Sequence, residues 1–251
     1  MEELKAIFSH RSIRKYKDKA VDDELLRKIL EAGFRGSTTG NMQLYSIIVT
    51  KEAELKRKLW ENHFKQDMVN QAPVVLTFCA DINRFDKWCE LREAEPGYDN
   101  FLWFINAAID AIIAAQNICI AAEANGLGIC YLGTTTYMAD NIIKILNCPK
   151  GVVPVTTVVI GYPDENPELV DRLPYSGIIH EEAYHDYDAN AIEEIYQEKE
   201  NLELTRQLLE ENQVDNLAKV FTEKRYLKKD NVFFSQKFIK ILEKQGFMNN
   251  K

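Results

Sequence analysis

The order of apolar and polar positions predicts helices and strands in alternation along the first two thirds of the chain. Short apolar, β-branched runs predict four strands, at residues 44–50, 74–80, 129–132 and 155–161. Residues 25–32 carry apolar side chains at helical spacing, and Asp22 is placed to cap that helix. A polar helix is expected from Glu52 onward and a short one at 142–146. Strands interleaved with helices in this way indicate an α+β domain.

The most apolar stretch, residues 101–125, predicts one long helix with Gly126 as the glycine just beyond its end. A membrane span is the alternative interpretation. It would place four polar side chains in hydrocarbon at high cost, namely Asn106, Asp110, Gln116 and Asn117. The flanks also lack basic anchors. We therefore expect a central buried helix, packed inside the domain or against a partner subunit, and no membrane association.

The last part of the chain has a different composition. Prolines mark an extended connection between residues 163 and 174, and from about Ala189 the chain is almost free of glycine and proline. This pattern predicts long polar helices with too little apolar surface to form a separate domain. We expect a single domain overall, with a core at 1–188 and a C-terminal helical arm at 189–251 that packs on the core or on a partner subunit.

Two shorter segments carry weaker expectations. Residues 84–99 are charged and predicted to be irregular, as in a mobile segment near a site. Pro149 and Pro154 are expected to bracket the turn that leads into the fourth strand.

The balance of charges excludes several classes of partner. The 251 residues include 31 Lys and Arg against 39 Asp and Glu, which gives a formal net charge of -8. Nucleic-acid binding and adhesion to anionic lipid both need clustered basic charge, so neither is expected. The five cysteines are scattered without a CxxC pair. Together with a start that lacks the features of a signal peptide, they favour a cytoplasmic protein with reduced thiols.

The run His10-Arg11-Ser12-Ile13-Arg14 is the first candidate for chemistry. Two guanidinium groups, an imidazole and a hydroxyl within five residues can surround a phosphate. In an extended segment, Ser12 and Arg14 would lie on the same side. A solvated basic turn at the end of the first helix explains the same residues, and the run alone does not decide between them. The loop 37–43, rich in hydroxyl and amide groups, could bind a polar heterocycle but is also typical of turns.

Other patterns do not qualify as sites. Gly126-Leu127-Gly128 lacks the third glycine of a dinucleotide fingerprint and leads from a helix into a strand, the opposite of the required order. The two histidines of HEEAYH are five residues apart, so they would not share a helical face as zinc ligands do. We expect no metal site, and the sequence contains no nucleophile elbow or P-loop.

Taken together, several segments resemble the nitroreductase family, and in particular its NfsA/Frp-like flavin reductase branch. The matching text is HRSIRKY, STTGNMQLYSIIVT, KQDMVNQAP, VVLTFCADINR, AAEANGLGICYLG, VVIGYPDENPELVDRLP and HEEAY, in family order over residues 1–184, followed by EKQGF at 243–247. Each segment is weak alone, but their order and spacing are specific. The resemblance implies a nitroreductase-like fold: a central, mostly antiparallel sheet flanked by helices, with a C-terminal helical arm, in a homodimer.

The resemblance also implies a set of FMN contacts. His10, Arg11, Ser12 and Arg14 match the motif that holds FMN, with His10 and Ser12 serving its phosphate and Arg14 reaching the phosphate or the pyrimidine side of the ring. Thr38 matches a loop position that contacts FMN from the other subunit. The remaining implied contacts are Gln66, which would hydrogen-bond the isoalloxazine, Tyr131, Leu132, Gly133 and Thr134, which match the loop along the ring, and Arg172, which matches the second cation of a Lys-x-Arg phosphate clamp.

The sequence departs from the family pattern at two of these places. Val170 stands at the clamp's lysine position with Asp171 beside it, which would weaken the hold on phosphate. Thr134 stands where many relatives have glycine, which would narrow the space over the ring.

The implied activity is that of an FMN-dependent oxidoreductase with NAD(P)H as co-substrate. Hydride would pass from NAD(P)H to the flavin, and two electrons would then pass to a nitroaromatic, quinone or flavin acceptor by a ping-pong mechanism. No side chain need act as acid or nucleophile, while Arg14 and Gln66 would tune the flavin. The alternatives are a non-catalytic FMN-binding sensor or carrier, a specialised FMN reductase of halogenated or enone substrates, and a helical interaction protein with incidental motifs.

Overall fold

The computed structural model describes residues 4–249, which divide into two compact units. The first unit comprises the residues up to 168 together with those from 236 onward, and the second comprises 169–235. The expected division into a core at 1–188 and an arm at 189–251 stays a prediction.

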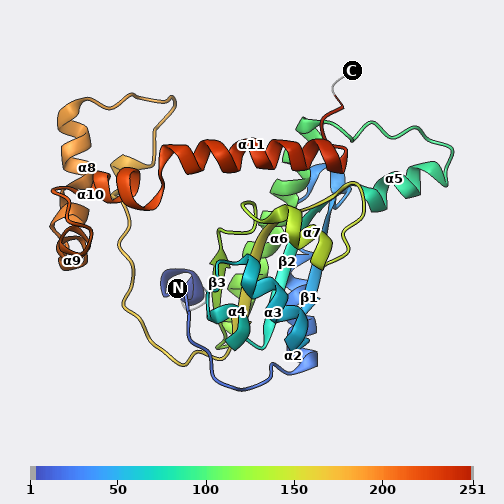
Figure 1. Ribbon diagram of the computed structural model, residues 1–251, viewed down its shortest axis with the longest axis horizontal. Helices are drawn as coiled ribbons and strands as arrows, with labels where there is room; N and C mark the ends of the chain where they lie inside the picture. The colour runs from blue at the N-terminus through green and yellow to red at the C-terminus, as the bar shows by residue number, and fades with distance from the viewer. Residues whose placement is uncertain (1–3, 250–251) are drawn as a thin grey trace. The chain divides into compact units, whose positions relative to one another are not determined.

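The first unit is built around a four-stranded sheet (Figure 1). Strands β1 (Tyr45–Thr50), β2 (Val74–Asp81), β3 (Gly128–Leu132) and β4 (Val152–Gly161) lie in the order β1-β2-β4-β3. All three pairings are antiparallel. The four predicted strands and the α+β class are therefore confirmed.

Strand β4 begins earlier than the sequence predicts. Pro154 lies inside it, opposite Cys79, at the point where the register with β2 shifts between Phe78 and Cys79. A proline has no N–H to donate to the ladder, and an irregularity of this kind tolerates the missing bond. The prediction that Pro154 ends a turn before the strand was wrong for that reason.

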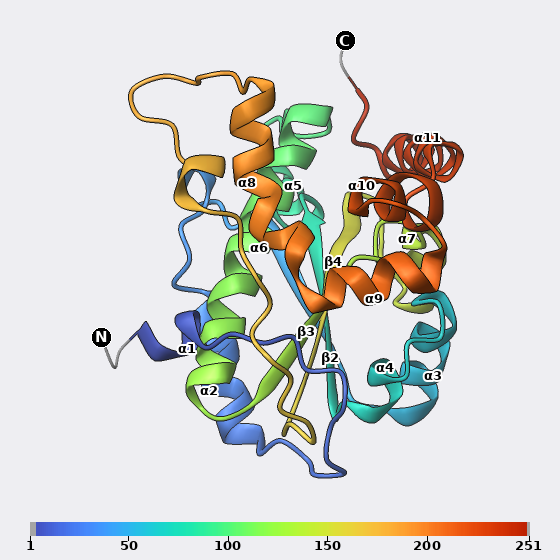
Figure 2. The same ribbon diagram turned by 90° about the vertical axis from the view of Figure 1, so that its left-hand side faces the viewer.

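Helices cover both faces of the sheet (Figure 2). On one face, α2 (Asp23–Gly33) and α6 (Phe101–Ala124) pack on each other and on the apolar side chains of the strands. On the other face lie α3 (Ala53–Asn62), α4 (Met68–Gln71) and α7 (Ala139–Ile145). A sheet buried on two sides has near-continuous apolar strands, as the fully buried β2 does.

The central helix α6 has the predicted position and ending. The amide of Gly126 donates to the Glu123 carbonyl and that of Leu127 to the Ala122 carbonyl, at 3.0 Å each. Gly126 has a φ of 76°, so this is a Schellman ending. By length and composition α6 is the one described helix that could cross a membrane. Its alanine-rich side is buried in the core, and the side chain of Asp110 is 1% exposed.

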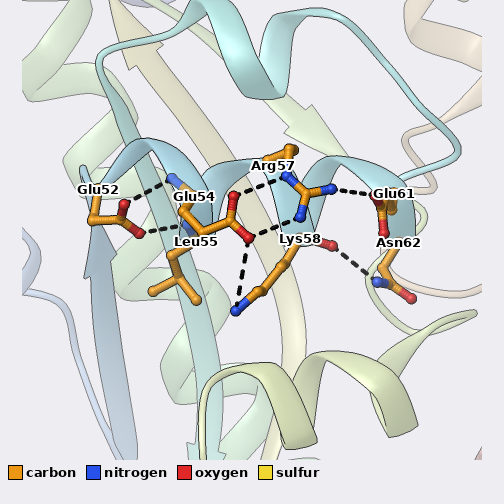
Figure 3. A network of polar contacts seen from close by, with 7 residues as sticks. All are labelled: Glu52, Glu54, Leu55, Arg57, Lys58, Glu61 and Asn62. Atoms are coloured by element: carbon orange, nitrogen blue, oxygen red, sulfur yellow. Dashed lines mark hydrogen bonds and ion pairs between the residues drawn. The ribbon is translucent and has the colours of Figure 1, made fainter.

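Helix α2 begins at the predicted cap, and α3 begins one residue after its predicted start at Glu52, which caps it. Asp22 accepts the Leu25 amide at 2.9 Å, and the Glu52 carboxylate accepts the amides of Glu54 and Leu55 at 2.8 and 2.6 Å. On the outer face of α3, Arg57 pairs with Glu54 and with Glu61 (Figure 3). Exposed pairs of this kind contribute about 0.3–0.5 kcal/mol each, so the buried face of α3 holds the helix in place.

Part of the segment 84–99 is helical, contrary to the irregular conformation predicted. Helix α5 spans Asn83–Glu90. Phe85 packs edge to face on Trp88 and on Tyr98, with ring centroids 5.3 and 5.2 Å apart. The many charges of this segment conceal the aromatic side on which the helix packs.

The remaining helices follow the extended connection. The second unit contains α8 (Ala189–Asn201), which begins where the sequence predicts, α9 (Glu203–Asn212), α10 (Leu217–Lys219) and a π-helical turn, Val220–Arg225. Helix α11 (Lys228–Gln245) begins in the second unit and ends in the first. There Phe247, fully buried, packs on Phe104 with ring centroids 5.4 Å apart.

We expect Gly128→Ala to destabilise the protein by roughly 1–3 kcal/mol, because it would overpack the core. A Cβ at Gly128 would lie 2.6 Å from Cγ1 of Ile13. Unfolding in urea measures the change, with Gly97→Ala as the control, since a Cβ at Gly97 meets nothing within 4 Å. Equal midpoints for the two variants would contradict this close approach.

Candidate active site

The segment His10 to Arg14 lies along the free edge of β3. Ser12 forms a parallel bridge with Ile129, and the Ile13 amide donates to the Ile129 carbonyl at 2.9 Å. The side chain of Ile13 is buried, whereas that of Arg14 is exposed. Since side chains alternate along extended backbone, Ser12 and Arg14 share the side that faces away from the core.

The basic side chains of this segment are only partly engaged. His10 Nδ1 lies 2.7 Å from Oε1 of Glu123, near the end of α6. One guanidinium nitrogen of Arg11 donates to the Ser9 carbonyl at 3.0 Å, and its buried Nε has no hydrogen-bond partner within residues 4–249. An unpaired buried donor of this kind marks a place where an anion could bind.

A second cluster joins the end of α3 to the turn after β3. His63, with no exposed surface, places Nδ1 2.8 Å from the Thr134 hydroxyl oxygen. The side-chain amide of Gln66 donates to the His63 carbonyl at 3.0 Å. Burial lowers the pKa of His63 from 6.5 to about 4, so the imidazole is neutral at pH 7.

The same strand carries the rest of this cluster. Tyr131 and Leu132 end β3, and the Tyr131 hydroxyl hydrogen-bonds Gln116 on α6 at 3.3 Å. Burial raises the pKa of Tyr131, which stays protonated. Gly133 is exposed, and a Cβ there would meet nothing within 4 Å, so the backbone is open to a ligand.

Strand β3 therefore brings most of the predicted site residues together. Ile129, beside Ser12, and Leu132 are about 10 Å apart at the usual strand rise. One end of this line holds His10, Arg11, Ser12 and Arg14, and the other holds Gln66 with residues 131–134. An elongated ligand with a phosphate at one end and a polar ring at the other fits this donor set, and FMN is such a molecule.

Thr38 lies apart from the His10 end of this line. Thr38 precedes a 3-10 turn, Thr39–Asn41, whose Thr39 amide donates to the buried Asp110 carboxylate at 2.9 Å. Asp110 and the Glu123 that binds His10 are thirteen residues apart on α6, or about 20 Å along the helix. Arg172 belongs to the second unit, where it donates to the carbonyls of Val170 and Asp171 at 3.1 and 2.9 Å.

Sequence reasoning missed three residues that support the site. Glu123 pairs with His10, His63 joins Gln66 to Thr134, and Asp110 holds the loop that carries Thr38 through its Thr39 and Leu44 amide contacts. Asp110 is a carboxylate in the middle of a largely apolar helix, which is a usable signal. The pattern around His63 and Glu123 offers none, since their partners are distant in sequence.

The comparisons with known proteins identify the family. The model of the nitroreductase family matches residues 7–65 and 61–162, so the chain belongs to the nitroreductase family. It is 35% identical over 189 residues to the FMN reductase [NAD(P)H] of Bacillus subtilis, covering 74% of this chain and 76% of that protein.

Two solved structures resemble the whole chain. A crystal structure described as an oxidoreductase from Bacteroides fragilis NCTC 9343 has a TM-score of 0.96 and 53% identity, covering 97% of this chain and 99% of that one. The NADPH:FMN oxidoreductase of Vibrio harveyi, complexed with NAD+, has a TM-score of 0.84 and 26% identity, covering 100% of both chains. The nitroreductase-like fold expected from the sequence is thereby confirmed.

We expect His63 to make the protein less stable as the pH falls from 6.5 to 4. The unfolded chain binds this proton near pH 6.5 and the folded chain only near pH 4, so acid favours the unfolded state across that window. Between pH 7 and pH 4, His63→Asn should lose roughly 3 kcal/mol less stability than the wild type. Urea unfolding at both pH values measures the difference. Equal losses would show that His63 titrates normally.

Proposed function

We propose that this chain is an FMN-dependent NAD(P)H oxidoreductase that passes two electrons to a nitroaromatic, quinone or flavin acceptor by a ping-pong mechanism. FMN, when bound, would supply the redox chemistry by accepting hydride from NAD(P)H. The observation that carries the proposal is the arrangement along β3, with basic donors at one end and the Gln66–Thr134 cluster at the other. Similarity to the Bacillus subtilis FMN reductase and to the Vibrio harveyi NADPH:FMN oxidoreductase supports it.

The basic end would hold the phosphate. A carboxylate only accepts hydrogen bonds, so Nδ1 of His10 carries a proton and donates it in a hydrogen bond to Glu123. This leaves Nε2 of His10 for the ligand. Ser12 adds a hydroxyl, and Arg11 and Arg14 add planar donors.

The other end would hold the ring. Gln66 and Thr134 offer polar groups, and Tyr131, Leu132 and Gly133 form the backbone along which a flat ring would lie. Arg14 and Gln66 are the residues we assign to tuning, because a donor or cation near the ring stabilises the negative charge of its reduced form.

Arg172 is our proposed additional cation for the phosphate, by its match to the family's clamp. Its neighbour Asp171 pairs with Lys199, with Nζ 2.6 Å from Oδ2, and both side chains are largely buried. This ion pair neutralises the carboxylate that otherwise would repel a phosphate. The valine at position 170, in place of the clamp's lysine, is thus the main departure from the family's clamp.

We propose further that the protein works as a homodimer. Helix α6 presents a run of large apolar side chains to solvent: Phe101, Leu102, Ile105, Ile109 and Ile112, each 37–64% exposed. A contiguous apolar surface of this kind marks an interface. The Thr38 loop and His10 contact α6 at positions about 20 Å apart, Asp110 and Glu123. This separation supports the same assignment, because Thr38 would then serve the partner's site.

Anaerobic titration of the purified protein with NADH and with NADPH tests the activity. We expect a yellow protein whose visible flavin absorption bleaches with at least one of them and returns on addition of a quinone. A colourless protein that does not take up added FMN would contradict the proposal. A yellow protein that neither nucleotide bleaches would favour the sensor or carrier.

We expect Arg14→Ala to lose most of its bound FMN, or its bound flavin to be reduced by NAD(P)H at least tenfold more slowly. The reason is that a hydrogen bond from a charged group contributes about 1.5–3 kcal/mol of binding free energy. Flavin content per protein and stopped-flow reduction measure the two effects. Lys15→Ala is the matched control. Lys15 is the exposed neighbour of Arg14, and the backbone amides of both residues donate to the Glu165 carboxylate. Wild-type flavin content and reduction kinetics in Arg14→Ala would refute this assignment.

We expect Ile109→Lys to convert the dimer into a monomer, because it buries an unpaired charge in the proposed interface. Light scattering after size exclusion measures the mass. Ala124→Lys, also exposed on α6 but away from the apolar run, is the control and should stay dimeric. A wild-type chain that is monomeric at micromolar concentration would contradict the dimer.

A further inference from the structure

His63 occupies a position that links two parts of the proposed flavin site. Its carbonyl accepts the Gln66 amide at 3.0 Å, and its ring contacts the Thr134 hydroxyl at 2.8 Å. The ring is fully buried, and its Nε2 has no hydrogen-bond partner among the described residues. His63 thus contacts Gln66 through its backbone carbonyl and Thr134 through its ring.

The backbone after His63 is held in an uncommon conformation. Phe64 and Lys65 have φ values of 54° and 56°, in the left-handed region that side chains other than glycine rarely adopt. The amide of Lys65 donates to the Trp60 carbonyl at 3.0 Å and that of Gln66 to the His63 carbonyl at 3.2 Å. Two consecutive residues of this kind persist only where surrounding contacts determine them, which is common at ligand sites.

The hydrogen-bond inventory indicates which way the Thr134 proton points. A neutral imidazole carries one N–H, and in buried positions an unpaired N–H is rarer than an unpaired acceptor. Because Nε2 of His63 is the unpaired atom, the proton belongs on Nδ1. His63 then donates to the Thr134 oxygen, and the Thr134 hydroxyl proton is free to donate elsewhere.

We propose that His63 is a positioning residue that turns the Thr134 hydroxyl into a fixed hydrogen-bond donor to the flavin ring, while its backbone holds Gln66 for the same ring. This inference rests on the proposed function. Thr134, which replaces the smaller residue of many relatives, then adds a specific contact to the ring as well as bulk. Burial lowers the pKa of His63, because a charged ring is unfavourable in a buried place. The ring therefore stays neutral and carries a single N–H.

A merely structural role for His63 would be shared by its neighbour. Asn141 on α7 donates to Asn62 on α3 at 2.8 Å, so another hydrogen bond already holds the end of α3 beside His63. In the described part of the chain, Asn62 and Asn141 form no hydrogen bond with Gln66 or Thr134. Asn141→Ala is therefore the matched control for loosening this junction without altering the proposed donor.

The test measures binding of FMN to the apoproteins by quenching of flavin fluorescence, together with the visible absorption bands of the bound flavin. We expect Thr134→Val and His63→Leu each to raise the Kd roughly fivefold, the worth of one neutral hydrogen bond, and to shift the bands alike. The double variant should lose no more than either single one, because the two act as a unit. His63→Asn, whose amide can replace the Nδ1 donor, and Thr134→Ser should bind as the wild type does.

The wild type is titrated first, and failure to bind FMN would overturn the proposed function and this inference together. If the wild type binds, wild-type Kd and bands in Thr134→Val would overturn the inference alone. So would additive losses in the double variant, or an equal loss in Asn141→Ala. Circular dichroism checks that each variant is folded, and Thr134→Val keeps the test decisive should His63→Leu not fold.

Discussion

Everything in the proposed site depends on hydrogen bonding along both edges of β3. On one edge β4 pairs with the strand from Gly128 to Leu132, and on the other the segment around Ser12 and Ile13 docks on Ile129. The docking needs a strand residue without a side chain, because a Cβ at Gly128 would overlap Ile13. With this contact the basic segment lies in line with residues 131–134. Without it the same residues would form the solvated turn that the sequence also allows.

The sequence predicted the elements whose signals are local. The Asp22 cap, the Gly126 ending and the four strands depend on neighbours a few residues away, and the structure confirms all of them. The predictions from sequence were wrong where tertiary contacts outweighed a local preference. Pro154 sits inside β4 because the register shifts opposite it, and α5 forms because aromatic packing outweighs its charges.

The residues of the proposed site also differ in whether their signals are local in the sequence. The basic run is contiguous, so its composition made it a candidate phosphate site, and the resemblance to the family then favoured that interpretation over a solvated turn. The residues that orient the site are not contiguous: Glu123 is 113 positions from His10, and Thr134 is 71 from His63. No periodicity connects such pairs, and only the crossing of α3 and α6 with β3 brings them together. A resemblance to relatives transfers the groups that touch a ligand, but the residues behind them must be found in the fold.

The two ends of the line also differ in how they would select what binds. The proposed binding of phosphate by His10 and the arginines would be electrostatic, would weaken with salt and would discriminate little between phosphorylated ligands. The buried end is different, because a hydroxyl or amide held in one orientation rejects a ring that cannot pair with it, at the cost of an unsatisfied polar group. Selectivity for a flavin over another phosphorylated molecule would therefore reside in Gln66 and Thr134, and their rigidity in His63.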